Sequence, residues 1–461
     1  MQDKTIDEKQ LLEKESKYCS YGDTVHYVDP AKIFAHCEGS FLYDAKDTPY
    51  LDLQMWYSAV NFGYGNKRIN EALKRQIDTL PQIASQYLHK EKIDLAEKLC
   101  LHMKKVFKTD GRVHFNVGGS QAVEDSLKLV RNFCKGKSLM FAFEGGYHGR
   151  TLAASEITSS YRYRRRYGHF GNRGNFIPFP YCFRCPYGKK KEDCGMFCVK
   201  QFERLFETEY YGVWDPKANE GEYAAFYVEC IQGTGGYVVP PEGYYKELKK
   251  VLDRYNVLMV DDEIQMGIYR TGKLFGIEHF GVTPDVVVFG KAITNGLNPL
   301  SGIWAREELI SPQTFPVGST HSTFASNPLG TATALEVVNM TSETDYEKKV
   351  MEMGGYFLDS LKNLQSRHKN IIGDIDGLGL VLRAEICAED GFTPDREMLD
   401  RMVHEGLKGD IDMDGKKYGL VLDVGGYYKN VVTLAPSLHI TKEEIDLAVK
   451  LLDAVITRAK K

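Results

Sequence analysis

The chain has 461 residues, 43% hydrophobic and 26% charged, with a formal net charge of −4. This length allows two or three domains with a large core, and the near-neutral charge argues against a nucleic-acid partner. Ten cysteines and no apolar stretch typical of an export signal or a membrane span favour a cytoplasmic enzyme with reduced thiols.

The N-terminal part predicts a polar arm followed by a small sheet. Residues 1–30 are polar and mixed in charge, with one helix expected in DEKQLLEKESKY. The segment CEGSFLYDAKDTPYLDLQ then alternates apolar and polar residues around turn signals, which is typical of a small antiparallel sheet.

From Asn66 to about Asn327, helical and apolar strand segments alternate. Lys67–Leu80 and Ile93–Val106 are expected to form amphipathic helices between buried strands. This pattern predicts an α/β domain whose mainly parallel sheet is covered on both faces.

Beyond Pro328 the sequence predicts a long helix, strands in DIDGLGLVLRAEI and YGLVLDV, and a final helix from Lys442. We therefore expect three regions along the chain. They are 1–65 (arm and strands joining the small domain), 66–327 (large domain) and 328–461 (C-terminal part of a smaller α+β domain).

A glycine-rich turn precedes a helix in FNVGGSQAVEDSLKLVR. Gly118, Gly119 and Ser120 stand directly before a helix that is expected to begin near Gln121. Glycines let the backbone approach an anion closely, and free N–H groups at a helix N-terminus favour a phosphate. A plain helix cap is the alternative for this pattern taken alone.

Four cysteines gather in YCFRCPYGKKKEDCGMFC, with the spacing CxxC-x8-CxxxC. Thiolates at such spacings can hold a structural zinc ion, and reduced packing cysteines are the favoured alternative. The residues are Cys182, Cys185, Cys194 and Cys198. The nearby basic run RYRRRYGH, Arg162–His169, is interpreted as a solvated loop or as the lining of a site entrance.

Two motifs carry most of the information about chemistry, VLMVDDEIQMG and PDVVVFGKAITNG. Each begins with an apolar strand and then breaks into polar residues, placing Asp262 and Lys291 at strand ends where ligands of parallel sheets bind. Strand alternation directs the rival carboxylate, Asp261, to the opposite face. A lysine there can form a Schiff base with a carbonyl cofactor, and a carboxylate can hold a pyridinium nitrogen protonated. Pyridoxal phosphate (PLP) uses this arrangement.

The ordered motifs DDEIQMGIYRTG, FGKAITNGLNPLSG and HSTFASNPLG resemble the class III, fold type I PLP-dependent aminotransferases, which include the ornithine and 4-aminobutyrate enzymes. The resemblance runs from about Tyr57 to Thr441. It implies a large domain with a mainly parallel seven-stranded sheet, a smaller α+β domain, and a homodimer or dimer of dimers.

The resemblance also implies roles for residues of the cofactor site. Gly119 and Ser120 correspond to the phosphate cradle, although Gly118 and Gln121 replace the serine and glutamate of the family pattern. The other implied contacts are Tyr147 on the pyridine ring, Gln265 at the phenolate oxygen, and Thr323 reaching the cofactor phosphate of the neighbouring subunit.

For the substrate, Arg150 matches an arginine that grips a carboxylate distant from the reacting amine, and Tyr57 is a second candidate donor. Thr234 and Thr433 stand where the family often carries a paired glutamate and arginine. We therefore expect an aminotransferase that moves an amino group from an omega-amino acid or related amine to 2-oxoglutarate or pyruvate. An amino-acid racemase or epimerase on the same scaffold is the alternative.

Overall fold

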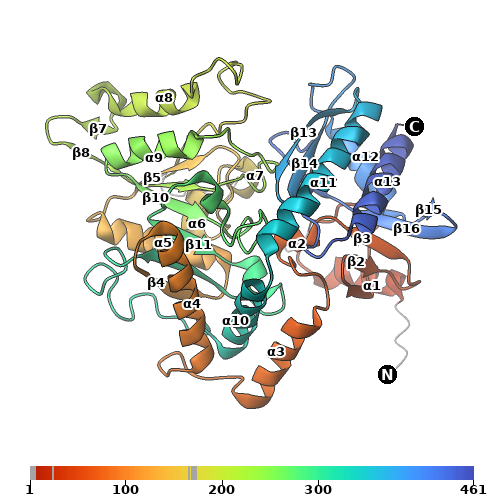
Figure 1. Ribbon diagram of the computed structural model, residues 1–461, viewed down its shortest axis with the longest axis horizontal. Coiled ribbons are helices and arrows are strands. Elements are labelled where there is room, and N and C mark those ends of the chain that lie inside the picture. The colour runs from red at the N-terminus through yellow and green to blue at the C-terminus, as the bar shows by residue number, and fades with distance from the viewer. Residues whose placement is uncertain (1–6, 23–24, 165–166, 168–173, 461) are drawn as a thin grey trace. The chain divides into compact units, whose positions relative to one another are not determined.

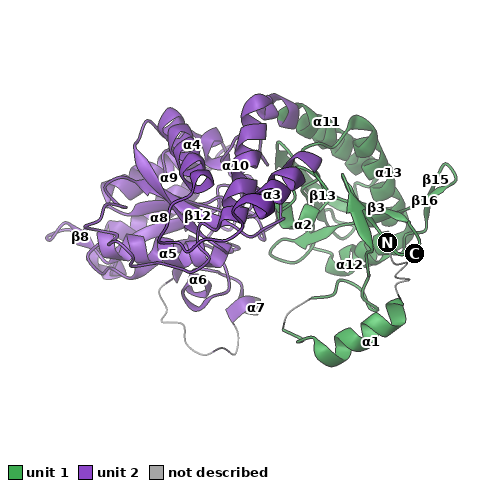
Figure 2. Ribbon diagram, turned by 90° about the horizontal axis from the view of Figure 1, so that it is seen from below, with its two compact units in different colours: residues 1–66, 351–461 green, residues 67–350 purple. Residues whose placement is uncertain are grey.

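The computed structural model describes residues 7–22, 25–164, 167 and 174–460, and the chain divides into two compact units. Unit 1 comprises Met1–Asn66 and Met351–Lys461, and unit 2 comprises Lys67–Val350 (Figure 2). The second division lies within α11 (Tyr346–Arg367), later than the expected position at 327/328, because α10 (Pro328–Glu343) packs against helices of unit 2. The basic run Arg162–His169 lies partly outside the described residues.

Unit 2 is built on a seven-stranded sheet, as the family resemblance implies. Its strands, in spatial order, are β4 (Gly111–Asn116), β12 (Ser301–Arg306), β11 (Val286–Phe289), β10 (Leu258–Asp262), β9 (Tyr223–Val228), β5 (Leu139–Phe143) and β6 (Gly174–Ile177). β12 is antiparallel to both of its neighbours, and the five strands from β11 to β6 are parallel.

Helices cover both faces of this sheet, and Figure 1 shows α5 and α9 on opposite sides of it. The helices of unit 2 are α3 (Lys67–Thr79), α4 (Lys90–Phe107), α5 (Gly119–Phe133), α6 (Leu152–Glu156), α7 (Tyr161–Arg164), α8 (Phe197–Glu203), α9 (Tyr244–Arg254), α10 and the start of α11. Short elements are β7 (Trp214–Asp215), β8 (Glu220–Gly221), η1 (Arg204–Phe206), η2 (Glu209–Tyr211), η3 (Gly276–Phe280) and η4 (Lys291–Thr294).

Alternation along the strands explains the two covered faces. Ala142 and Val260 pack in a cluster with Val123 of α5, whereas Phe143 lies with its ring 6.3 Å from that of Tyr244 in α9. Successive strand residues point to opposite faces, so strands apolar throughout require cover on both. This arrangement leaves the carboxyl ends of the parallel strands open for polar side chains.

Unit 1 combines the two ends of the chain in two sheets. The first has the order β1 (His36–Glu38), β2 (Phe41–Tyr43), β3 (Pro49–Asp52), β16 (Lys416–Val421) and β15 (Ile411–Met413); the second has β13 (Ile372–Leu378), β14 (Val381–Ile386), β18 (Val431–Leu434) and β17 (Asp423–Gly425). The helices are α1 (Glu8–Tyr18), α2 (Met55–Ser58), α12 (Arg396–Leu407), α13 (Lys442–Ala459) and most of α11. Among the described helices of the chain, none is long and apolar enough to cross a membrane.

Candidate active site

The expected carboxylate and amine leave the same edge of the unit 2 sheet. β10 ends at Asp262, which pairs in register with Val288 of the adjacent parallel strand β11. Lys291 follows Val288 by three residues and begins η4 with a φ of 45°. Asp262 is buried, and Lys291 is partly exposed.

Asp262 is held by a histidine from a different loop. Its Oδ2 lies 2.9 Å from Nδ1 of His148, and its Oδ1 accepts a hydrogen bond of 3.1 Å from the backbone N–H of Ile264. Burial acts to lower the pKa of the His148 imidazole, but the Asp262 carboxylate outweighs it, and the net shift is upward. The contact with Asp262 therefore favours the protonated form of His148.

A second buried carboxylate, Glu229, follows β9 at the same edge. It accepts hydrogen bonds from the backbone N–H groups of Tyr147, at 2.8 Å, and Gly233, at 2.9 Å. Burial raises the pKa of the Glu229 carboxyl to about 7, although the nearby His148 opposes the shift. Glu229 thus joins the loops that follow β5 and β9.

The N-terminus of α5 contributes backbone donors. Gly118 is the N-cap residue, and Gly119 begins the helix. The N–H groups in the first turn of an α-helix have no hydrogen-bond partner within the helix. A Cβ atom added at Gly119 would lie 2.8 Å from Cδ1 of Ile264, so a side chain at this position would require the end of the Ile264 side chain to move. Ser120 Oγ accepts a hydrogen bond of 3.3 Å from the backbone N–H of Arg150.

Aromatic and amide groups complete this part of unit 2. The Tyr147 ring contacts Tyr163 edge-on at 5.2 Å, and the exposed Arg150 guanidinium lies 4.4 Å from the Tyr163 ring centroid. Nε2 of Gln265 donates a hydrogen bond of 3.0 Å to the Tyr237 hydroxyl. Tyr163 therefore contacts both Tyr147 and Arg150 and holds them near each other.

The remaining residues considered in the sequence are divided between the two units. Thr323 is exposed in a turn of unit 2, and the hydroxyl of Thr234 donates to the Gly145 carbonyl at 3.3 Å. Tyr57 and Thr433 belong to unit 1. The Tyr57 hydroxyl lies 3.3 Å from that of Tyr27, a residue of the same unit.

The four cysteines of the CxxC-x8-CxxxC segment line one cavity of about 190 Å³, each partly exposed and reduced. Burial, with Cys194 and Cys182 nearby, raises the pKa of the Cys198 thiol to about 11. Across the described part of the chain, the ligand atoms that gather within 4.8 Å of one another belong instead to the buried Cys230, Asp261 and Glu263. A zinc site in the cysteine segment remains a hypothesis.

Comparison with known proteins gives the family directly. The class-III aminotransferase profile matches residues 25–456. An alanine/serine racemase of Pyrococcus horikoshii is 34% identical over 97% of this chain and 90% of its own. An ornithine aminotransferase of Staphylococcus epidermidis is 31% identical over 93% and 95%. The crystal structure of a Bacillus anthracis aminotransferase superposes with a TM-score of 0.84, 27% identity and 98% coverage of both chains.

The chain is a class-III aminotransferase. This family has the fold type I architecture and depends on PLP, so both expectations from the sequence are confirmed. The residues present in this aminotransferase fit the cofactor. The crevice edge offers the Lys291 amine, the buried Asp262 carboxylate and the α5 N-terminus, whose Gly119 leaves space for an anion against Ile264.

The sequence did not reveal all residues of this site. No pattern in the sequence assigns His148 a role, yet its ring contacts Asp262 directly. The sequence analysis also does not select Glu229 or Tyr237. Glu229 immediately follows the buried strand β9, much as Asp262 ends β10 and Lys291 follows β11. A polar residue at the end of each parallel strand is the sequence feature that could have identified Glu229.

Proposed function

We propose that this aminotransferase takes the amino group of an omega-amino acid or a related amine and passes it to 2-oxoglutarate or pyruvate. The juxtaposition of Lys291 and Asp262 at the ends of β11 and β10 carries the assignment of the reacting centre. Bound PLP supplies an electron sink for the carbon that carries the amino group.

Each residue of the centre has a definite task in this proposal. Nζ of Lys291 would hold the cofactor, and the same amine would serve as the base and acid that moves a proton. The Asp262 carboxylate would hold the pyridine nitrogen in its protonated form, and His148 fixes that carboxylate through its 2.9 Å contact. Gly119 and Ser120 would hold the phosphate, and Tyr147 and Gln265 would contact the ring and its phenolate oxygen.

The donor class rests on Arg150. Its guanidinium is exposed yet oriented over the ring of Tyr163, with the Tyr147 ring 5.9 Å away. A planar guanidinium binds a carboxylate with two parallel hydrogen bonds, which selects substrates by the distance between amine and carboxylate. Tyr57, with an exposed hydroxyl, is the second proposed donor to that carboxylate.

A homodimer is also part of the proposal, with Thr323 acting on the partner's cofactor phosphate. Exposed apolar side chains support an interface near this turn: Tyr87, Leu88 and Phe324 are exposed by 65%, 74% and 69%. The segment that contains Tyr87 and Leu88 lies beside the turn that contains Thr323, as the 3.3 Å contact between Ser85 Oγ and the His321 ring shows. Ten reduced cysteines are consistent with a cytoplasmic location.

An amino-acid racemase is the second candidate, favoured by the Pyrococcus horikoshii relative. Neither threonine of the altered pair offers a charge: Thr234 donates to a carbonyl, and Thr433 donates to Asp423 Oδ2 at 2.7 Å. Without the glutamate–arginine pair, the enzyme lacks one way to accept an amino donor and an oxo-acid acceptor in turn. A racemase, which uses a single amino acid substrate, does not need to do so.

One experiment separates the two reactions. The PLP-loaded enzyme is mixed with an excess of a chiral amino acid donor in the absence of any oxo acid, and products are followed by chiral chromatography. An aminotransferase releases one carbonyl product per subunit, an aldehyde from a terminal amine or a 2-oxo acid from an α-amino group, and then stops. Continuous inversion of the donor, with no oxo product, would replace the aminotransferase reaction by racemisation.

The shared site is tested by mixing two inactive variants, Lys291→Ala and Thr323→Ala, after dissociation. If Thr323 serves the partner subunit, each hybrid dimer regains one intact site, and activity returns to about a quarter of the wild-type value. If Thr323 serves its own subunit, hybrids contain no intact site and activity stays at the level of the separate variants.

A further inference from the structure

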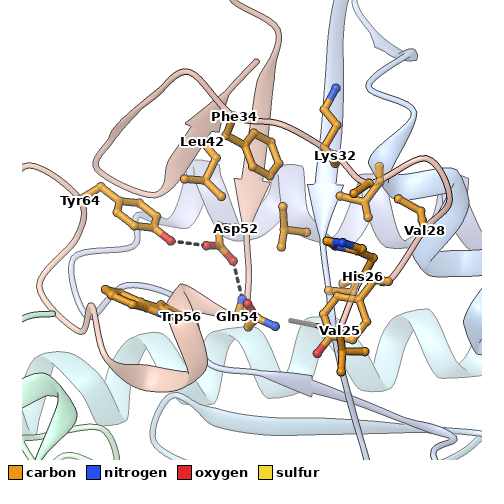
Figure 3. A pocket seen from close by; sticks show the side chains of 15 residues that line it. Val25, His26, Val28, Lys32, Phe34, Leu42, Asp52, Gln54, Trp56 and Tyr64 are labelled. Atoms are coloured by element: carbon orange, nitrogen blue, oxygen red, sulfur yellow. Dashed lines mark hydrogen bonds between the residues drawn. The ribbon is translucent and has the colours of Figure 1, made fainter. Parts of the chain in front are cut away.

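Unit 1 contains a cavity of about 300 Å³ that none of the reaction residues line. Its walls are mainly apolar, and four aromatic rings border it, those of Tyr27, Phe34, Trp56 and Tyr64. The carboxylate of Asp52 faces the same cavity, between Tyr64 and Gln54 (Figure 3). A ring-lined cavity with a carboxylate matches the chemistry that recognises alkylammonium groups, whose positive charge is attracted to aromatic faces.

Among the residues that the structure describes, Asp52 has hydrogen-bond donors but no positively charged partner. It is 1% exposed and accepts hydrogen bonds from the Tyr64 hydroxyl and the backbone N–H groups of Gln54 and Met55, at 2.7, 2.7 and 3.0 Å. Within the described ranges, no lysine, arginine or histidine nitrogen lies within 4.0 Å of this carboxylate. A buried carboxylate held by neutral donors is stabilised further when a cation arrives.

A second carboxylate, Asp423, adds negative charge beside the cavity. It accepts a 3.0 Å hydrogen bond from the hydroxyl of Tyr27, one of the lining rings. Burial raises the pKa of the Asp52 carboxyl, and the charge of Asp423 acts in the same direction. A cation bound beside Asp52 would offset the repulsion between these two carboxylates.

Two basic residues also border the cavity, but each is already paired with another acid. Nζ of Lys32 lies 3.0 Å from Asp44 Oδ2, and Figure 3 shows that its nitrogen points away from Asp52. The His26 ring lies 3.2 Å from Glu15 Oε1. An anionic ligand would have to compete with these carboxylates while approaching Asp52, so the charge balance favours a cation.

The backbone beside the cavity adopts an unusual conformation. Met55, Trp56, Tyr57 and Ser58 all have positive φ, between 43° and 61°, although none is glycine. Left-handed geometry is unfavourable for residues other than glycine, and strain of this kind concentrates where side chains are positioned for binding. Here it places the Trp56 ring, which is 54% exposed, at the cavity wall.

We propose that this cavity binds an alkylammonium group, with Asp52 supplying the negative charge and Trp56 a ring face. The ligand is a free amine that binds in unit 1 as an effector. The proposal is independent of the reaction proposed above, because a binding cavity in unit 1 needs neither Lys291 nor its cofactor.

Choline provides a direct probe, because its quaternary nitrogen cannot condense with a carbonyl cofactor. Isothermal titration of the full-length, PLP-loaded protein with choline should give saturable binding. The neutral analogue of the same shape, 3,3-dimethyl-1-butanol, should bind at least about tenfold more weakly. Equal affinity for the two, or no binding of choline, would overturn the proposal.

Variants assign the binding to this cavity. Asp52→Asn and Trp56→Leu should each weaken choline binding about tenfold or more, whereas Glu38→Gln, which removes an exposed charge of the same unit, should not. Because Asp52 also receives three donors inside the fold, Trp56→Leu decides the matter if Asp52→Asn does not fold. Unchanged affinity in Trp56→Leu and in any folded Asp52→Asn would refute the assignment.

Discussion

Nδ1 of His148 lies 2.9 Å from Oδ2 of Asp262, and both side chains are almost completely buried. The contact joins the loop after β5 to the end of β10, 114 residues later in the chain. A charged hydrogen bond inside the protein is stronger than its counterpart in water. We therefore expect His148 to influence the Asp262 carboxylate and, through it, the proposed contact of Asp262 with the cofactor ring.

The first prediction concerns this histidine. His148→Phe keeps an aromatic ring but removes the hydrogen bond, so kcat/KM should fall by about 10- to 150-fold, the range expected for a bond to a charged group. Steady-state kinetics measures the loss. His102→Phe, which removes a histidine paired with Glu278 outside the crevice, is the matched control and should retain its activity.

Lys291→Ala should abolish turnover while leaving a folded protein that still takes up PLP without covalent attachment, because attachment and proton transfer need the same amine. Borohydride reduction of the wild type, followed by peptide mapping, should place the cofactor on the peptide containing Lys291. Labelling of a different lysine would disprove the assignment.

Asp262→Asn should bind the cofactor but slow the chemical step by several orders of magnitude, since a neutral amide cannot hold the ring nitrogen protonated. Asp261→Asn should be mild, because Asp261 lies with Cys230 and Glu263, and burial together with Glu263 raises its pKa well above the usual range. Single-turnover rates compare the two. Similar losses in both variants would contradict the assignment of Asp262.

Glu229 predicts a specific dependence of stability on pH. The folded state holds its proton up to a pKa of about 7, against 4.5 for the ordinary carboxyl. The folded protein thus binds more protons than the unfolded chain between these values, and the contribution of Glu229 to stability falls as the pH rises through this window. Glu229→Gln cannot titrate, so the difference in unfolding free energy, wild type minus variant, should decrease by about 3 kcal/mol from pH 4.5 to 7. Urea unfolding at several pH values measures it; a constant difference would show that Glu229 does not titrate there.

Arg150→Ala should lower kcat/KM for carboxylate-bearing donors by about 30- to 1000-fold, because a bidentate contact is lost. Simple amines without a carboxylate should be affected far less. Arg164→Ala is a matched control, since Arg164 stacks on Phe176 near the same loop. Equal losses for both donor classes would mean that Arg150 supports the fold rather than the substrate.

Local patterns were sufficient for the elements that carry the chemistry. The apolar runs before Asp262 and Lys291 are strands because β-rich, fully apolar segments need cover on both faces, and the structure has them as β10 and β11. The position of a polar residue at a strand end depends only on where the apolar run stops. For that reason the cofactor and the family could be predicted from the sequence.

Contacts between distant segments could be decided only by the tertiary structure. His148 meets Asp262, and Glu229 binds the backbone of Tyr147, because parallel strands far apart in the chain end side by side. Likewise β3 pairs in parallel with β16, aligning Tyr50 with Gly419, so that both chain ends build one unit. Such pairings depend on the order of strands in a sheet, which no local periodicity encodes. The left-handed turn Met55–Ser58 is a further case, since its unfavourable backbone is imposed by the surrounding fold and not by its own residues.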